Sequence, residues 1–291
     1  MSIIDRFISK RSEGSAQGDM AFIEHVEQLR WHVVRSVIAL IIAAVFAWFN
    51  IGWIFDYIIL GPAKEDFVSY KLLCQLSHVL NTDVLCMDAF DIEFQNTQLT
   101  GQFMTSFSVA LTAGFIIAFP YILWEIWRFV KPALKPVERK KANGLVFWCS
   151  VLFLLGILFA YYVVAPFTIN FFATFQLSEQ FQNIITISSY YDTMLDLIVG
   201  MGIVFQLPIL MYFLGKIGIV NAHFLRDKRR YAIVIIMFIA AIITPPDWLS
   251  IWLVALPLIL LYELSILLIV NNKEEKERQK QLAIKEKYKN L

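Results

Sequence analysis

The chain has 291 residues, of which 58% are hydrophobic and 17% are charged, and its formal net charge is +1. Soluble domains are about half apolar and a quarter charged, so this composition excludes an ordinary soluble domain and indicates an integral membrane protein. A net charge this close to zero gives no reason to expect a nucleic-acid partner. The first 19 residues are polar and lack an apolar core, so no cleaved secretory signal peptide is expected.

Six apolar segments are long enough, or nearly so, to cross a bilayer as helices, which takes about 20 residues. They predict an all-α membrane protein with spans over 33–49, 103–127, 145–166, 194–214, 231–244 and 248–270. The fifth has only 14 residues before Pro245. At about 1.5 Å per residue it is roughly 21 Å long, against a hydrocarbon core of about 30 Å. Either its boundary is misplaced or the membrane is thinned beside it.

Basic residues predict the orientation, because Lys and Arg are in excess in cytoplasmic loops. Of the 25 Lys and Arg, 23 fall in the arm up to Arg35, the segment 128–141, the loop after the fourth span, and the tail from Lys273. These regions alternate with regions poor in basic residues. Both termini are therefore expected in the cytoplasm.

These patterns together predict the organisation of the chain. A cytoplasmic arm with an amphipathic helix (1–32) precedes a six-helix transmembrane domain (33–270), and a charged cytoplasmic tail (271–291) follows it. The connections expected within the domain are a long periplasmic loop over 51–100 and cytoplasmic loops over 128–143 and 215–230.

The expected periplasmic loop is acidic and holds two of the three cysteines, Cys74 and Cys86. Cysteines on the oxidising side of a membrane can pair. The alternatives are a disulfide between them or two free thiols, and we predict the disulfide. Cys149 falls in the third span, where a small apolar role is expected.

Polar residues at membrane depth are functional candidates, because burying them in hydrocarbon is costly. Asp192 and Asp196 are one helical turn apart at the outer end of the fourth span, and Gln206 returns close to the same face. The alternatives are headgroup contacts for the two aspartates and an internal hydrogen bond for Gln206. Glu263 is expected near the inner end of the sixth span.

Glu125 is expected near the inner end of the second span, where it can pair with Arg128 at the spacing of one helical turn. Prolines in or at the ends of spans bend their helices. They predict a curved wall with a concave face, and they are Pro120, Pro166, Pro208 and Pro257.

The sequence lacks HExxH, GxSxG and CxxC motifs and a glycine-rich phosphate loop. Its four histidines are scattered over both predicted sides of the membrane. No catalytic residue, metal or cofactor is therefore expected. A secondary transporter of a small solute stays as the alternative function, and it would require an inverted repeat and polar groups at broken helices.

Five motifs occur in the order and spacing of the TatC family, which the chain resembles from about residue 20 to 270. They are "FIEHVEQLR", "PYILWEIWRFVKPALKPVERK", "AYYVVAPF", "GMGIVFQLPI", and "LRDKRRYAIV" followed by "TPPDWLS". The resemblance implies the multispanning core of a twin-arginine translocase in the bacterial inner membrane. It implies TatA-type or TatB-type single-span partners, twin-arginine signal peptides of folded cargo, contacts with lipids and with further copies, and the proton-motive force as energy source.

The resemblance also implies where a signal peptide binds. Glu138 is the only acid in the basic segment 128–141, and a guanidinium can bind a carboxylate through two parallel hydrogen bonds. Gln28 stands where the family usually has an acid, so Glu27 is expected to replace it. The alternative for Glu138 is that it neutralises Arg139 or caps a helix after Pro136. The expected signal-peptide residues are Glu24, Glu27, Gln28, Arg30, Phe129, Glu138 and Arg139.

The fourth-span motif carries a second expectation. The family often has a glutamate where Gln206 stands, and glutamine keeps hydrogen bonding but loses ionisation. We expect Gln206, with Asp192, Asp196 and Glu263, to contact partner helices. The residues expected to be structural are Pro62, Pro120, Pro132, Pro208, Pro245, Pro246 and Asp247.

Overall fold

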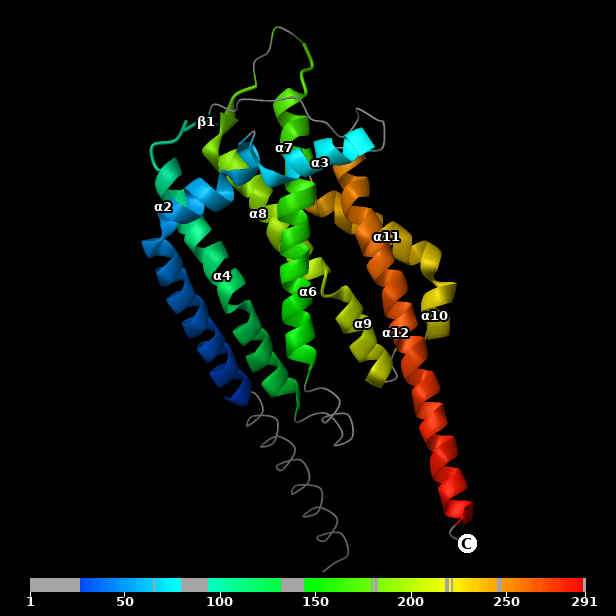
Figure 1. The fold of residues 1–291 in the computed structure, drawn as a ribbon. Helices are drawn as coiled ribbons and strands as arrows, with labels where there is room; N and C mark the ends of the chain where they lie inside the picture. The colour runs from blue at the N-terminus through cyan, green and yellow to red at the C-terminus, as the bar shows by residue number, and fades with distance from the viewer. Residues whose placement is uncertain are drawn as a thin grey trace, which may run out of the picture. The chain divides into compact units, whose positions relative to one another are not determined.

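The structure is a computed structural model of the whole chain. It describes residues 27–64, 66–79, 94–131, 144–178, 180, 183–217, 220, 222–244 and 248–289, with the backbone alone for 73, 76–79, 216–217, 249 and 270–289. The described residues are almost wholly helical (Figure 1), which confirms the predicted all-α class. The chain divides into two compact units, Met1–Phe49 with Ala110–Phe147, and Asn50–Val109 with Trp148–Leu291.

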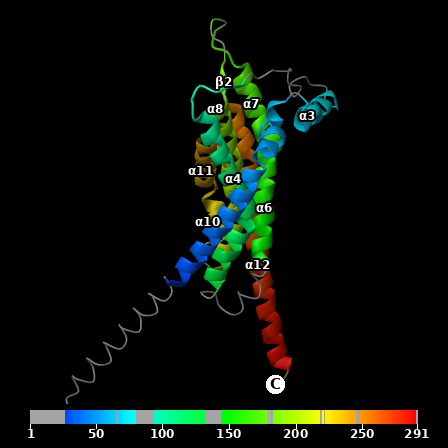
Figure 2. The same ribbon diagram turned by 90° about the vertical axis from the view of Figure 1, so that its left-hand side faces the viewer.

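The first unit is built around two helices that lie side by side in Figures 1 and 2. They are the first helix, Glu27–Phe49, and most of α4, Gly101–Val130. A glycine lets them approach closely, because a Cβ added to Gly114 would lie 2.6 Å from the backbone nitrogen of Ala44. Pro120 lies inside α4.

The second unit contains the other elements, except that the first three residues of α6 belong to the first unit. In chain order their bounds are α2 Ile51–Trp53, η1 Ile54–Ile59, η2 Gly61–Ala63, α3 Val68–Val79, β1 Phe94–Gln95, α6 Leu145–Phe159, η4 Ala160–Val164, α7 Ala165–Thr174, β2 Ile185–Thr186, α8 Ile187–Val204, α9 Leu207–Ile217, α10 Ala222–Asp227, α11 Arg229–Ile243 and α12 Trp248–Lys289. The two short strands pair in parallel. Helix α12 packs against α9 and α11 and continues unbroken toward the C-terminus (Figure 2).

Helix α8 supplies much of the core of the second unit. It begins at Ile187, where the Thr186 side chain accepts a hydrogen bond from the Ser189 backbone N–H at 3.2 Å, as an N-cap does. Leu197 and Met201 on its inner face are fully buried. Burial of this face stabilises the unit through packing, because lipid tails are as apolar as the core.

Tyrosine hydroxyls from η4 and from α8 bind backbone carbonyls at the end of the π-helical segment η1. The Tyr161 hydroxyl of η4 donates to the carbonyl of Ile58 at 2.7 Å, and the Tyr190 hydroxyl of α8 donates to the carbonyl of Ile59 at 2.7 Å. Both acceptor carbonyls belong to the last two residues of η1. Pro62 is fully buried in the following turn, and its carbonyl accepts from the Tyr70 hydroxyl at 2.7 Å.

Five helices in the described part of the chain are long and apolar enough to cross a membrane: Glu27–Phe49, Gly101–Val130, Leu145–Thr174, Ile187–Gly215 and Ser250–Ile269. They match the predicted first, second, third, fourth and sixth spans. The predicted fifth span is α11, which has only 15 residues, or about 22 Å. The count of six spans and the orientation of the termini stay predictions.

Two predicted spans differ in detail from the structure. The third continues to Thr174 instead of ending at Pro166, because this proline is the second residue of α7, where no intrahelical N–H bond is required. The fourth is not one continuous helix, since α8 ends at Val204 and α9 begins at Leu207. Pro208 explains the break, because it has no N–H and its ring clashes with the carbonyl four residues earlier.

Candidate functional site

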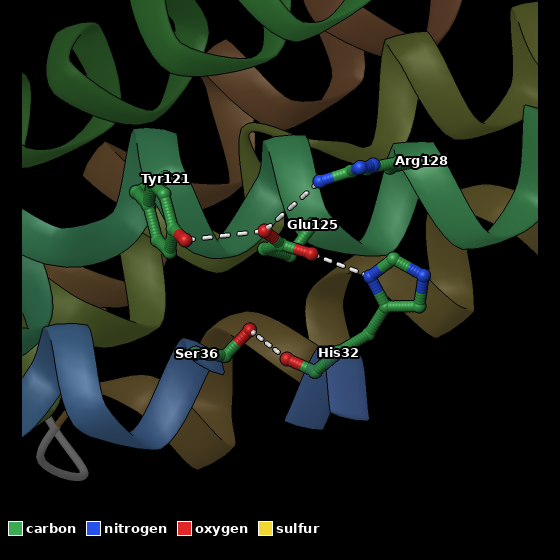
Figure 3. Close-up of polar contacts among 5 residues, drawn as sticks. All are labelled: His32, Ser36, Tyr121, Glu125 and Arg128. Carbon is green, nitrogen blue, oxygen red and sulfur yellow. Dashed lines mark hydrogen bonds and ion pairs between the residues drawn. The ribbon is translucent and has the colours of Figure 1, made fainter. Parts of the chain in front are cut away.

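A buried carboxylate, Glu125, joins the two helices of the first unit (Figure 3). Only 1% of it is exposed. One carboxylate oxygen accepts a hydrogen bond from Nδ1 of His32 on the first helix. The other accepts from the Tyr121 hydroxyl at 3.1 Å and lies 3.9 Å from a guanidinium nitrogen of Arg128. Three groups thus compensate a charge that would be costly to bury alone.

The sequence predicted only part of this cluster. It paired Glu125 with Arg128, which the structure confirms as an i,i+3 ion pair. It missed His32, because this contact joins residues 93 positions apart. The available signal was the spacing of polar residues along the otherwise apolar first helix, where Gln28, His32 and Arg35 follow one another at helical intervals.

A hollow of about 410 Å³ lies beside the cluster, and we call it the basic hollow. It is lined by Gln28, Trp31, His32, Arg35 and Arg128. Its polar side chains are an amide, an indole, an imidazole and two guanidinium groups. All of them can donate hydrogen bonds, and none is a carboxylate.

A second hollow of about 370 Å³ shares His32 with the first but has an apolar lining. Phe129 is part of that lining, and its ring meets the His32 ring edge-on at 6.1 Å between centroids. The end of α4 therefore presents a basic hollow and an apolar one, with His32 between them.

The predicted signal-peptide residues fall into two groups. Glu27 and Arg30 form an exposed i,i+3 ion pair at 3.7 Å, Gln28 lines the basic hollow and Phe129 lines the apolar one. An exposed pair such as Glu27–Arg30 contributes only about 0–1 kcal/mol, so Glu27 is available to another guanidinium. The other predicted residues of this set lie outside the described residues: Glu24, Glu138 and Arg139.

The break in the fourth span is tied to the third by Gln206. Its amide nitrogen donates to the backbone carbonyl of Cys149 in α6 at 3.0 Å. This is the internal hydrogen bond that the sequence offered as the alternative to a partner contact. The amide oxygen is the atom left for a partner.

The three acidic residues predicted to contact partners lie in different surroundings. Asp192 and Asp196 are exposed on one face of α8. Glu263 of α12 accepts a hydrogen bond from the Arg229 guanidinium of α11 at 2.6 Å, so it connects two helices of the second unit. The pair is about half exposed.

Cys74 is disulfide-bonded. Cys86, its predicted partner, lies outside the described residues, so the pairing itself stays a prediction. Cys149 is a free, buried thiol. Across the described ranges, no three His, Cys, Asp or Glu side chains gather in the way that a metal site requires.

The prolines predicted to be structural are described in part. Pro208 is fully buried at the start of α9, like Pro62 in η2. Pro120 lies inside α4. The other predicted structural residues lie outside the described residues: Pro132, Pro245, Pro246 and Asp247.

The chain is similar to known proteins of one family. The family described as "Sec-independent protein translocase protein (TatC)" matches residues 24–257. The Sec-independent protein translocase protein TatC of Blattabacterium sp. subsp. Periplaneta americana is 41% identical over 252 residues, covering 86% of this chain and 95% of the relative. That of Carboxydothermus hydrogenoformans is 34% identical over 248 residues, covering 85% and 91%. A crystal structure of the twin arginine translocase receptor TatC matches with a TM-score of 0.63 at 31% identity, covering 84% of this chain and 97% of that one.

Proposed function

Since this chain belongs to the TatC family of Sec-independent protein translocase proteins, we propose that it is a receptor for twin-arginine signal peptides. It is a membrane component of the twin-arginine translocation system, and the comparisons give no support to a transporter of small solutes. We place it in the bacterial inner membrane with both termini in the cytoplasm. Single-span TatA-type or TatB-type partners complete the export site, and the proton-motive force drives export.

The hydrogen bond between His32 of the first helix and Glu125 of α4 is the observation that supports this proposal. Glu125 holds His32 against α4, and His32 lies little more than one turn after Glu27 and Gln28. Helix α4 ends at Val130, eight residues before Glu138. Of the two carboxylates proposed to bind the arginines, Glu27 is thus the first residue of one of these joined helices, and Glu138 follows the other helix in the sequence.

Charge explains why carboxylates are needed here. Lys135, Arg139, Lys140 and Lys141 surround Glu138 in the sequence and would repel a second pair of guanidinium groups. A carboxylate at the contact point reverses that repulsion and binds a guanidinium through two parallel hydrogen bonds. One arginine would then pair with Glu138 and the other with Glu27.

Charge removal at Glu138 tests the proposal. Glu138→Ala and Glu138→Gln should each weaken binding of a twin-arginine peptide about 10-fold or more, because a hydrogen bond to a charged group contributes about 1.5–3 kcal/mol. Glu138→Asp should keep part of the affinity, and Gln28→Glu should preserve or improve it. Peptide titration against the purified protein measures all four.

Asp227→Asn is the matched control, since Asp227 is an exposed acid on α10. It should bind the peptide as the parent does. Parental peptide binding and normal cargo export by Glu138→Gln would disprove the charge-pairing mechanism.

A further inference from the structure

The basic hollow beside Glu125 has a charge that signal recognition does not use. Its lining brings the guanidinium groups of Arg35 and Arg128 together with the donors of Gln28, Trp31 and His32. A twin-arginine peptide would meet like charge in it. The lining therefore suits an anionic ligand that accepts several hydrogen bonds.

The nearest carboxylate is already engaged. Glu125 is 1% exposed and accepts hydrogen bonds from His32 and Tyr121. It therefore offsets part of the positive charge of these side chains but does not line the hollow. Arg128 reaches it only at 3.9 Å and is itself 54% exposed. His32 uses Nδ1 for Glu125, which leaves Nε2 as the ring atom for a ligand. A net positive charge remains at the opening.

The position of the hollow along the helices identifies the depth at which the ligand lies. Both helices are long and apolar enough to span a membrane, and the hollow lies at the N-terminal end of one and the C-terminal end of the other. Trp31 in its lining is 51% exposed, and Val34 and Ile38 on the next turns are also exposed. Tryptophan concentrates at headgroup depth, and exposed aliphatic side chains beyond it suit acyl chains.

Arginine and tryptophan are also paired around this helix end. The Arg30 guanidinium lies 5.7 Å from the Trp31 ring centroid, and the Arg128 guanidinium lies 5.5 Å from that of Trp124. Such pairs keep long basic side chains at the interface while their stems cover apolar surface.

From these observations we propose that the basic hollow binds the phosphodiester headgroup of an anionic phospholipid in the leaflet at these helix ends, predicted to be the cytoplasmic one. Basic hollows between transmembrane helices on the cytoplasmic side are suited to such headgroups. The phosphate oxygens accept from Arg35 and Arg128, and the acyl chains lie along the exposed aliphatic side chains. The bound lipid lowers the positive charge of the hollow, whose lining does not include Glu27. The inference requires only that these helices span the membrane, and it does not depend on signal binding.

Native mass spectrometry of the full chain, purified in detergent and stripped of lipid, tests this proposal. Dioleoylphosphatidylglycerol should bind in preference to dioleoylphosphatidylcholine. Arg35→Gln should weaken phosphatidylglycerol binding about five-fold, since one basic residue near the surface contributes about that factor. Gln28→Glu should weaken it as well, because it places a carboxylate of nearly the same shape in the lining.

Arg35→Gln and Gln28→Glu leave the hydrogen-bond partners of Glu125 in place, so their effects report on the hollow and not on folding. Arg226→Gln on α10 is the matched control and should bind phosphatidylglycerol as the parent does. Equal binding of the two lipids, or parental binding by both hollow variants, overturns the proposal. The proposal is also overturned if inorganic phosphate or a twin-arginine peptide binds at the hollow and phosphatidylglycerol does not.

Discussion

Glu125 illustrates how a buried charge is retained near the end of a membrane-spanning helix. An isolated carboxylate there would be costly, but His32, Tyr121 and Arg128 each donate to it or pair with it. The first two of these contacts are partly buried hydrogen bonds. Removing the carboxylate would therefore leave donors without acceptors, which costs more than losing a surface pair.

We predict that Glu125→Ala lowers the free energy of unfolding by about 3 kcal/mol, the usual cost of breaking a buried pair. Glu125→Gln should be less severe, because the amide oxygen still accepts from His32 or Tyr121. Thermal unfolding in detergent measures both variants. Asp66→Asn is the control, since Asp66 forms an exposed ion pair with Lys71 at 2.7 Å. A Glu125→Ala variant as stable as Asp66→Asn would contradict the role of the cluster.

Gln206 has an internal role in the structure and a proposed external one. Its nitrogen donates to the carbonyl of Cys149, and its oxygen is the acceptor that we propose for a polar side chain on the helix of a partner. We predict that Gln206→Leu weakens crosslinking to a single-span partner about three-fold or more, as loss of one hydrogen bond within a membrane does. Signal-peptide binding should not change.

Cys149→Ala is the matched control for Gln206→Leu, because it keeps the backbone carbonyl that accepts the internal bond. It should recruit the partner as the parent does. Unchanged crosslinking in Gln206→Leu would assign Gln206 to the internal hydrogen bond alone.

At the scale of single residues, the sequence could predict contacts between residues that are close in the sequence. The Glu125–Arg128 pair follows from helical spacing, and the polar face containing Gln206 follows from periodicity. The His32–Glu125 contact could not be predicted in this way, because it depends on which helix faces α4. Glu138 is the only acid of the basic segment 128–141, but its role in signal binding came from the resemblance and stays a prediction.

At the scale of elements, apolar runs located the helices but not their interruptions. The break at Gln206 and the continuation past Pro166 both depend on how a proline is accommodated. Pro208 lies where its ring forces a new helix to begin, whereas Pro166 follows a π-helical segment and starts α7 without a gap. Apolar content does not distinguish the two cases.

Close contact between the first helix and α4 depends on Gly114, which has no side chain. We predict that Gly114→Ala lowers the melting temperature, because its Cβ would lie 2.6 Å from the backbone nitrogen of Ala44 and overpacking costs about 1–3 kcal/mol. Gly52→Ala is the control. Its Cβ would have no neighbour within 4 Å, so better helix propensity should leave stability unchanged or raise it by up to about 1 kcal/mol. Equal melting temperatures for the two variants would show that the helices are not in close contact at Gly114.

At the scale of the whole molecule, the short helix α11 determines on which side of the membrane the chain ends. With five crossing helices the termini lie on opposite sides, and with six they lie on the same side. Helix α11 has 15 residues and begins with Arg229 and Arg230, which predict a cytoplasmic start for it under the positive-inside rule. Its length of about 22 Å is short of a 30 Å core, so crossing requires a thinner membrane beside it.

We predict that it does cross, because the tail from Lys273 carries seven basic residues and favours the cytoplasm. A reporter that is active only outside should be silent when fused after residue 135, 222 or 285 and active after residue 75 or 180. The fusion after 285 is decisive for α11. If α11 stayed on the inner side, α12 would begin inside and carry residue 285 outside, and that fusion alone would become active. An active fusion after 135 would instead reverse the predicted orientation of the second span, and with it the predicted cytoplasmic placement of the residues proposed to bind the signal peptide and the lipid.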